Sequence, residues 1–97
     1  MKRSTVVVPW RGGLHLRPAA KLVRTAKNFH SAIFLKAGGK IADLRSIVSV
    51  ISLCATMGAT LDLEAMGDDE HDAVRAVERV FSAHGSAHAI HVTTEQV

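Results

Sequence analysis

The sequence predicts an α+β domain with a four-stranded, mostly antiparallel sheet and three helices on one face, in the order β-α-β-β-α-β-α. Four short segments of β-branched or alternating apolar residues predict the strands. Two longer segments repeat apolar residues every three or four positions, as amphipathic helices do. The chain has 97 residues, 47% hydrophobic and 22% charged, which is the composition of one small folded domain.

The first predicted elements are a strand and a helix joined by a loop. Residues 5–8 are β-branched and are followed by Pro9, which closes a strand. Beyond the loop at residues 10–15, Pro18 suits the first position of a helix, because its missing N–H has no intrahelical partner there. The apolar face of this helix comprises Ala19, Leu22, Val23, Ala26 and Phe29.

A hairpin and a short helix follow. Residues 33–37 and 40–44 are strand candidates, and the glycine pair at 38–39 favours a two-residue turn because glycine adopts positive φ. Ser46 can cap the N-terminus of a second helix that runs through Leu53.

The last predicted strand and helix lie side by side in the sequence. Apolar and acidic residues alternate along residues 61–65, which predicts a half-buried strand that Gly67 ends. Residues 68–72 are rich in acids and open a helix, because the positive end of the helix dipole favours acids in the first turn. The apolar face of this helix comprises Val74, Val77, Val80 and Phe81, and Gly85 would end it.

The tail is assigned separately. We expect a domain over residues 1–85 and a C-terminal extension over residues 86–97. Within the extension, residues 89–93 are open to three interpretations: a fifth short strand, an ordered extension or loose chain.

Composition excludes several classes of protein. No apolar run approaches the roughly 18 residues of a membrane span, and no secretory signal peptide is apparent. The single Cys54 cannot form an internal disulfide, which points to a reduced, cytoplasmic compartment, and we interpret it as a small core residue. One Trp and no Tyr supply a poor stacking platform for nucleic acid, despite a net charge of +3. The spacing of His84, His88 and His91 would let a helix gather them at a metal, but Gly85 interrupts that helix and no acid or cysteine completes the shell, so no metal is expected.

The most informative residue is His15, at the entrance of the first helix. Free backbone N–H groups and the helix dipole make such an entrance an anion site. Arg17 adds a guanidinium suited to phosphate oxygens. The positive surroundings favour a neutral imidazole, whose ring nitrogen can act as a nucleophile for a phosphoryl group. The residues alone leave a second interpretation open, in which His15 is an ordinary capping or surface residue.

Three segments carry a resemblance to a known family. Residues 13–19, Gly-Leu-His-Leu-Arg-Pro-Ala, resemble the active-site motif of HPr, the histidine-containing phosphocarrier family of the bacterial phosphoenolpyruvate-dependent phosphotransferase system. Residues 44–48, Leu-Arg-Ser-Ile-Val, resemble the family's regulatory-serine segment. Residues 67–70 resemble its approach to the last helix, and the resemblance covers about residues 6–84.

The resemblance implies an open-faced β-sandwich and a carrier function. His15 would accept a phosphoryl group on Nδ1 from phosphorylated enzyme I, which takes it from phosphoenolpyruvate, and pass it to a histidine of an EIIA domain. Arg17 would neutralise the phosphate. The phosphate-binding region would comprise Gly13, Leu16, Arg17 and Pro18. We expect a phosphoryl-transfer intermediate of sugar transport rather than an autonomous catalyst, a cytoplasmic monomer with no cofactor and no membrane insertion.

Three positions depart from the family pattern. Gly12 stands where a small polar side chain is common, so only backbone donors remain there. Leu16 replaces the usual alanine and enlarges the apolar rim. Cys54 replaces a glycine often found where the second helix ends.

The second helix is apolar around much of its circumference. Val50, Leu53 and Cys54 can face the core, while other apolar residues share a second face that predicts a docking surface for proteins. The alternative is a poorly phased helix whose apolar residues all lie in the core. Matching positions in the family contact enzyme I and EIIA, and the predicted surface comprises Leu16, Ala20, Arg24, Lys27, Ile47, Val48 and Ile51.

Ser46 has two compatible interpretations. It can cap the second helix, and it matches a serine that a dedicated ATP-dependent kinase phosphorylates in many bacteria, so an HPr serine kinase/phosphorylase is a candidate partner. A phosphate there would place negative charge inside the docking surface.

Two other functions stay open at the level of sequence. One is a regulatory binding module of a nitrogen- or carbon-control phosphorelay that is not coupled to sugar uptake. The other is a small nucleic-acid binder that uses the basic residues Arg11, Lys21, Arg24 and Lys27.

Overall fold

A computed structural model describes residues 1–82 and 93–95, and within them it has five strands and three helices. In chain order they are β1 (Lys2–Val7), α1 (Leu16–Ala26), β2 (Ala32–Ala37), β3 (Lys40–Asp43), α2 (Ile47–Ile51), β4 (Thr60–Met66), α3 (Glu70–Ser82) and β5 (Thr93–Glu95). The predicted order β-α-β-β-α-β-α is therefore confirmed through α3.

The strands form one antiparallel sheet in the order β3-β2-β4-β1-β5. The four predicted strands are all present, and β5 adds a fifth at the outer edge of β1, where Thr94 pairs with Ser4. The tail segment 89–93, for which the sequence allows three interpretations, lies outside the described residues except for Thr93, where β5 begins. The predicted boundary after residue 85 also lies outside them and stays a prediction.

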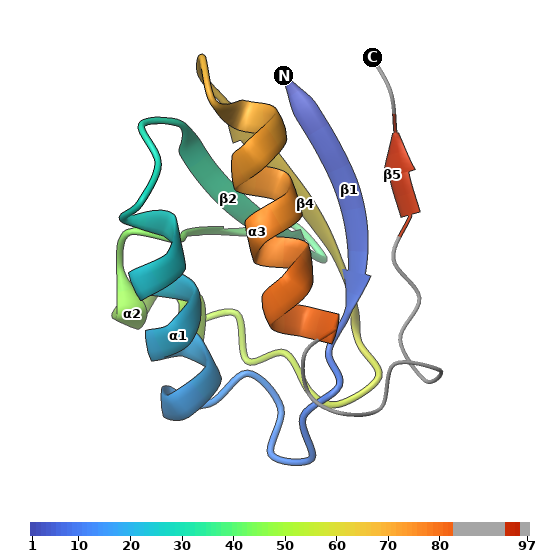
Figure 1. Ribbon diagram of the computed structural model, residues 1–97. Helices are drawn as coiled ribbons and strands as arrows, with labels where there is room; N and C mark the ends of the chain where they lie inside the picture. Colours follow the sequence, from blue (N-terminus) through green and yellow to red (C-terminus); the bar gives the residue numbers. More distant parts are fainter. Residues whose placement is uncertain (83–92, 96–97) are drawn as a thin grey trace.

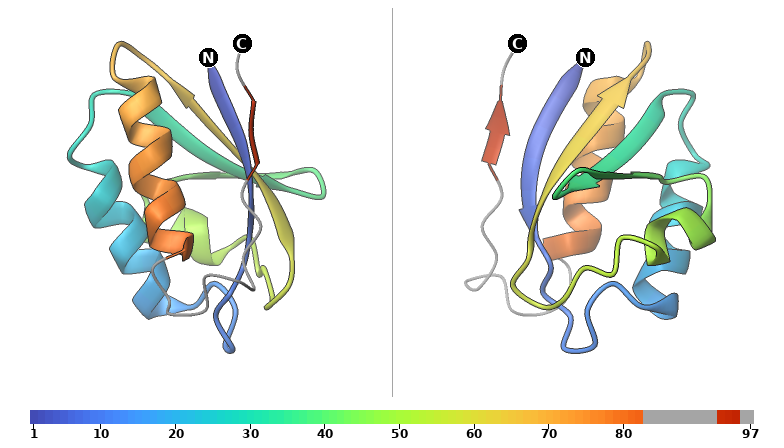
Figure 2. Two further views of the ribbon diagram at one scale, coloured as in Figure 1. Left: turned by 45° about the vertical axis from the view of Figure 1, so that its right-hand side comes forward. Right: turned by 180° about the vertical axis from the view of Figure 1, so that it is seen from behind.

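All three helices cover the same face of the sheet, and no helix of the described residues covers the other face (Figures 1 and 2). The alternation in β4 explains this, because Leu61, Leu63 and Ala65 are fully buried beneath the helices while the residues between them are not. Leu22 of α1 and Phe81 of α3 are also fully buried. Burial of each such large side chain contributes roughly 1.5–3 kcal/mol, so the sheet and the helices stabilise each other.

The hairpin turn is confirmed. Gly38 and Gly39 have φ of +51° and +85°, and they connect β2 to β3 with Ala37 paired to Lys40. Two consecutive positive φ values are what a type I′ turn requires, and glycine adopts them without steric cost.

Two helix boundaries differ from the prediction. α1 begins at Leu16, two residues before the predicted start, so Pro18 is its third residue. Proline is tolerated there because the first four N–H groups of a helix have no intrahelical acceptor. α2 ends at Ile51 rather than Leu53, and its short length gives it a single turn or slightly more.

The loop after β1 is anchored to α3 by an aromatic pair. The rings of Trp10 and Phe81 lie 5.0 Å apart between centroids and are tilted by 42°. Trp10 is only 8% exposed. Because Trp10 lies five residues before His15, this contact fixes the segment that leads to the helix entrance.

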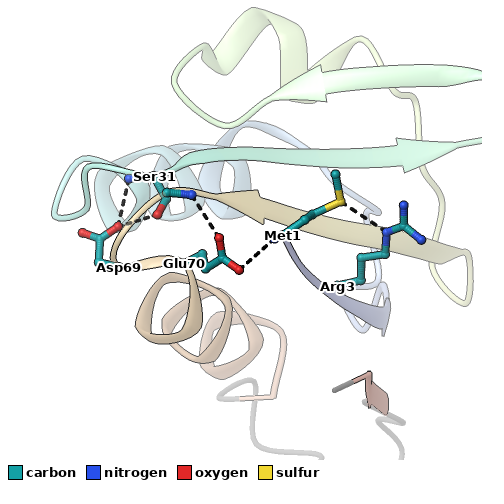
Figure 3. Close-up of polar contacts among 6 residues, drawn as sticks. Met1, Arg3, Ser31, Asp69 and Glu70 are labelled. Carbon is teal, nitrogen blue, oxygen red and sulfur yellow. Dashed lines mark hydrogen bonds and ion pairs between the residues drawn. The ribbon is translucent and has the colours of Figure 1, made fainter. Parts of the chain in front are cut away.

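Asp69 joins the start of α3 to the α1–β2 loop. Its carboxylate accepts a hydrogen bond from the N–H of His30 at 2.8 Å. It also accepts hydrogen bonds from the N–H (2.9 Å) and the hydroxyl of Ser31, which Figure 3 shows. These bonds, with that from the Ser31 hydroxyl the largest cause, lower the pKa of Asp69 below its ordinary value of 3.8.

Cys54 is exposed, so its interpretation as a core residue is wrong. Its φ is +53°, in the left-handed region, which turns the chain away from α2 and directs the side chain to solvent. Val50 and Leu53, which were also predicted to face the core, are buried. Within residues 1–82 and 93–95, no helix has the length and apolar character needed to cross a membrane.

Candidate phosphoryl-acceptor site

His15 is the N-cap residue of α1 and is exposed. Its backbone is extended (φ −91°, ψ −169°), and its carbonyl accepts the first helical hydrogen bond from the N–H of Ala19 at 3.0 Å. The imidazole makes no capping hydrogen bond to the helix. The interpretation of the ring as a capping group is therefore wrong, and the ring remains available at the surface.

The free main-chain donors of the site are those of Leu16 and Arg17. Neither N–H donates a hydrogen bond within the described part of the chain. By contrast, the N–H of Gly13 donates to the carbonyl of Trp10 at 2.8 Å, and Pro18 has none. Of the predicted phosphate-binding residues, Leu16 and Arg17 thus offer backbone donors at the positive end of the helix dipole.

A hollow of about 420 Å³ opens beside His15. Its charged residues are all cationic, and apart from His15 the rest of its lining is apolar or glycine. The lining comprises Trp10, Arg11, Gly12, His15, Arg17, Pro18, Lys21 and Val80. Three cations and no acid around one depression favour a negatively charged ligand or protein surface.

Sequence reasoning missed the part that α3 plays in this hollow. Val80 belongs to the apolar face of α3, so its spacing predicted a core residue, and it is indeed only 8% exposed. No local sequence pattern predicted that Trp10 would line the hollow. Both reach the hollow through the tertiary contact between the loop after β1 and α3, which no local pattern reveals.

The loop after α2 supports the segment that precedes His15. The N–H of Leu14 donates to the carbonyl of Ala55 at 2.9 Å. Gly13 has a φ of +74°, and a Cβ on it would lie 2.5 Å from the same carbonyl oxygen. Glycine is therefore required at position 13 both by its backbone conformation and by the close approach of the second loop.

Comparison with known proteins agrees with this geometry. Residues 2–83 match the family model described as the PTS HPr component phosphorylation site. The chain belongs to the HPr family.

Solved structures of HPr proteins are similar along most of the chain. HPr-C-His from Thermoanaerobacter tengcongensis matches with a TM-score of 0.82 and 36% identity, over 86% of this chain and 93% of that one. The phosphocarrier protein HPr from Bacillus anthracis str. Ames matches with a TM-score of 0.77 and 32% identity, over 81% and 94%. Crh of Bacillus subtilis, a catabolite repression protein in a domain-swapped dimer, matches with a TM-score of 0.70 and 34% identity, over 78% of this chain and 87% of that one.

The predicted HPr docking surface is partly exposed and partly packed. Val48 (75% exposed) and Leu16 (64%) are the most exposed of its apolar residues, and Ile51 is 37% exposed. Ile47 instead packs against the core and is half-buried. Leu16 and Val48 lie on α1 and α2, which pack against each other (Figure 1).

The other predicted residues of this surface and one unpredicted apolar residue differ in their exposure. Arg24 and Lys27 are exposed, and Ala20 is half-buried. Met57, in the loop after α2, is 58% exposed and was not predicted. Its sequence surroundings carry no periodicity, so only its exposure in the folded chain draws attention to it.

Ser46 caps α2 as predicted. Its hydroxyl accepts a hydrogen bond from the N–H of Ser49 at 3.1 Å, and its carbonyl accepts one from Val50 at 3.1 Å. The neighbouring Arg45 donates to the carbonyls of Phe29 (2.9 Å) and Ser31 (3.2 Å). The guanidinium of Arg45 is therefore committed to the α1–β2 loop rather than to Ser46.

One histidine–carboxylate group lies elsewhere in the described part of the chain. Ligand atoms of His30, Asp68 and Asp69 lie within 4.8 Å of one another. Both oxygens of Asp69 already accept hydrogen bonds from His30 and Ser31, so this group is explained by the loop that it holds. His84, His88 and His91 lie outside the described residues.

Proposed function

We propose that this HPr-family chain is a phosphocarrier that accepts a phosphoryl group on His15 from phosphorylated enzyme I and passes it to an EIIA domain of the phosphotransferase system. One observation carries the proposal. The His15 ring is exposed and makes no capping bond, beside two backbone N–H groups without acceptors in the described residues.

The chemistry uses the ring as a nucleophile. The lone pair of a neutral His15 nitrogen forms a bond to phosphorus, while the bond between phosphorus and the donor atom breaks and its electron pair stays with the donor. The N–H groups of Leu16 and Arg17, with the Arg17 guanidinium, would hold the phosphoryl oxygens. Transfer to EIIA repeats the exchange with this chain as donor, so the carrier is restored without a cofactor.

The surroundings of His15 suit a visiting protein better than a small substrate. The hollow is open to solvent and its charged residues are cationic, and exposed apolar residues lie on α1, on α2 and in the loop that follows α2. The exposed Val48 and Leu16 would form the apolar centre of the docking surface, with Arg24 and Lys27 at its rim for acidic partners. We propose that the carrier is cytoplasmic. We also propose that it acts as a monomer, because enzyme I and EIIA need an unobstructed docking surface.

Ser46 is proposed as a regulatory site. Its hydroxyl lies at the N-terminus of α2, where a phosphate is locally favourable. The added charge would lie two residues from the exposed Val48 and would repel an acidic partner.

Phosphorylation by enzyme I tests the carrier function directly. Incubation of the chain with phosphoenolpyruvate and enzyme I should give an acid-labile, alkali-stable phosphate that is lost in His15→Ala. His71→Ala is the matched control, because His71 is also exposed but lies on α3 away from the anion site. A phosphate that survives in His15→Ala would contradict the assignment.

A second candidate is a regulatory binding module of a nitrogen- or carbon-control phosphorelay. The similarity to Crh favours it, together with the position of Ser46 beside an exposed apolar residue. In that case Ser46→Asp should change the affinity for a carbon-control regulator, while phosphoryl transfer from His15 to EIIA domains of sugar transporters is absent. Transfer to such a domain would exclude a purely regulatory role.

A further inference from the structure

The strand β5 covers one edge of the sheet. Among the described residues the strand order is β3-β2-β4-β1-β5, so β1 lies inside the sheet only because β5 pairs with its outer side (Figure 1). The pairing runs along the middle of β1, from Arg3 to Thr5. β5 lies beyond residues 2–83, which match the HPr family, so it is an addition of this chain to the matched domain.

Without β5, the outer side of β1 would be an open edge with a row of unpaired N–H and C=O groups. Proteins commonly keep such an edge from pairing with other chains by making the strand short or by placing charges or proline on it. β1 has six residues, and its residues 4–7 contain neither a charge nor a proline. Three of these four, Thr5, Val6 and Val7, are β-branched and favour pairing.

The opposite edge of the sheet has the protection that β1 lacks. The strand β3 has only four residues, and a charged residue stands at each of its ends, Lys40 and Asp43. These are features that keep an edge strand from pairing with another chain, and among the described residues no strand covers β3. The contrast indicates that β5 gives β1 the protection that β3 has in its own length and charge.

We propose that β5 is an edge-covering strand: it pairs with the outer side of β1 and keeps a second copy of this chain from pairing its own β1 there. Two copies of one strand can pair antiparallel about a twofold axis, so two uncovered β1 edges fit each other. β5 has three residues, and such a short strand opens at a lower free energy than the sheet unfolds. The inference goes beyond the carrier function and does not depend on it.

The double variant Thr93→Pro/Thr94→Pro of the full chain tests the covering role. Successive N–H groups of a strand point to its two opposite sides, so two adjacent prolines remove a donor that faces β1. Thr93→Ala/Thr94→Ala is the matched control, because it changes the same residues and keeps both N–H groups. Size-exclusion chromatography with light scattering should give the monomer mass for wild type and control, and a rise toward twice that mass for the proline variant as its concentration increases. A proline variant that stays monomeric at every concentration would overturn the proposal.

Amide hydrogen exchange shows whether the edge of β1 is the part that opens. In the dilute proline variant, the N–H groups of residues 3–5 that face β5 should exchange at least about tenfold faster than in the wild type. They should regain protection as the protein is concentrated and the second copy pairs. The N–H groups of β1 that face β4 serve as an internal control. Equal exchange in wild type and proline variant would overturn the proposal, because β5 would then not be what protects this edge.

A lysine on β1 separates pairing at this edge from association through another surface. Thr5 is half-buried and lies opposite Asp62 of β4, so Thr5→Lys places its ammonium beside an acid within the monomer. Between two paired copies of β1 the added lysines would repel each other. Thr5→Lys combined with the two prolines should therefore return to the monomer mass. A dimer or aggregate that persists in this triple variant would overturn the proposal. None of these measurements involves phosphoryl transfer, so their failure leaves the carrier function intact.

Discussion

The carbonyl oxygen of Ala55 meets Gly13 so closely that a Cβ on Gly13 would lie 2.5 Å from it. The same oxygen accepts the hydrogen bond from the N–H of Leu14. The loop after α2 therefore clamps the two residues that come immediately before His15. The N-terminus of α1 and the loop after α2 are therefore in direct contact, and a substitution that disturbs one is expected to disturb the other.

Gly13→Ala should destabilise the protein and impair phosphoryl transfer. Gly39→Ala is the matched control, because Gly39 has a similar φ of +85° but open space where its Cβ would stand. Both variants incur about 1–2 kcal/mol from the left-handed conformation. Overlap with Ala55 should add roughly 1–3 kcal/mol in Gly13→Ala alone. Urea unfolding measures the difference, and equal losses in the two variants would argue against the clamp.

Substitutions at Ser46 should separate helix capping from charge. Ser46→Ala removes the acceptor for the N–H of Ser49 and should cost about 1 kcal/mol of unfolding free energy. Ser46→Asp and Ser46→Asn both keep a capping oxygen, but only the first adds a negative charge. We expect enzyme I to transfer about tenfold less efficiently to Ser46→Asp, or about 1.4 kcal/mol, and normally to Ser46→Asn. Equal transfer rates would remove the electrostatic basis for regulation.

Val48→Ala tests the docking surface. Val48 is 75% exposed, so its truncation should change stability by no more than about 0.5 kcal/mol. If Val48 is a central contact, binding to enzyme I should weaken about tenfold, as loss of an interface anchor does. Met66→Ala is the control. Met66 is also exposed (51%), but it is the last residue of β4, at the opposite end of that strand from Thr60, which pairs with Val7. Isothermal titration that finds equal affinities for both variants would exclude Val48 from the interface.

Local patterns predicted the parts of the fold that depend on local physics. Alternation placed Leu61 and Leu63 on the buried face of β4, and the glycine pair of the hairpin adopts the positive φ values that its turn requires. The boundary error at Pro18 has a simple cause, because the whole first turn of a helix lacks N–H acceptors and tolerates proline at more than one position. The start of α1 is set by its N-cap residue, His15, and not by the proline.

Contacts between distant segments could not be predicted in this way. Cys54 has an apolar side chain next to a buried stretch, and only its left-handed φ explains its exposure. Gly13 and Ala55 are about forty residues apart, and Trp10 meets Phe81 from the other end of the chain. The chemistry of His15 was predicted from its position at a helix entrance, whereas the hollow beside it depends on these tertiary contacts.

The hydrogen bonds of Asp69 predict an acid-dependent loss of stability. Because they lower the pKa of this carboxyl in the folded chain, the folded state favours the ionised form more than the unfolded state does. The resulting stabilisation is fully present above the ordinary pKa of 3.8 and is lost as pH falls through the lower folded-state value. Asp69→Asn should therefore unfold at lower urea concentration than the wild type at pH 7, and the gap should narrow as pH falls below 3.8.

Asp68→Asn is the matched control for this prediction. Asp68 is the exposed neighbour of Asp69, and it accepts no hydrogen bond among the residues that the structure describes. Its substitution should leave the urea midpoint at pH 7 close to that of the wild type. Urea titrations at several pH values would follow both variants. The prediction is contradicted if the difference in urea midpoint between wild type and Asp69→Asn stays constant from pH 7 to below 3.8. The loss of stability would then come from the shape of the amide, and the charge of the carboxylate would not be what holds Ser31 and His30.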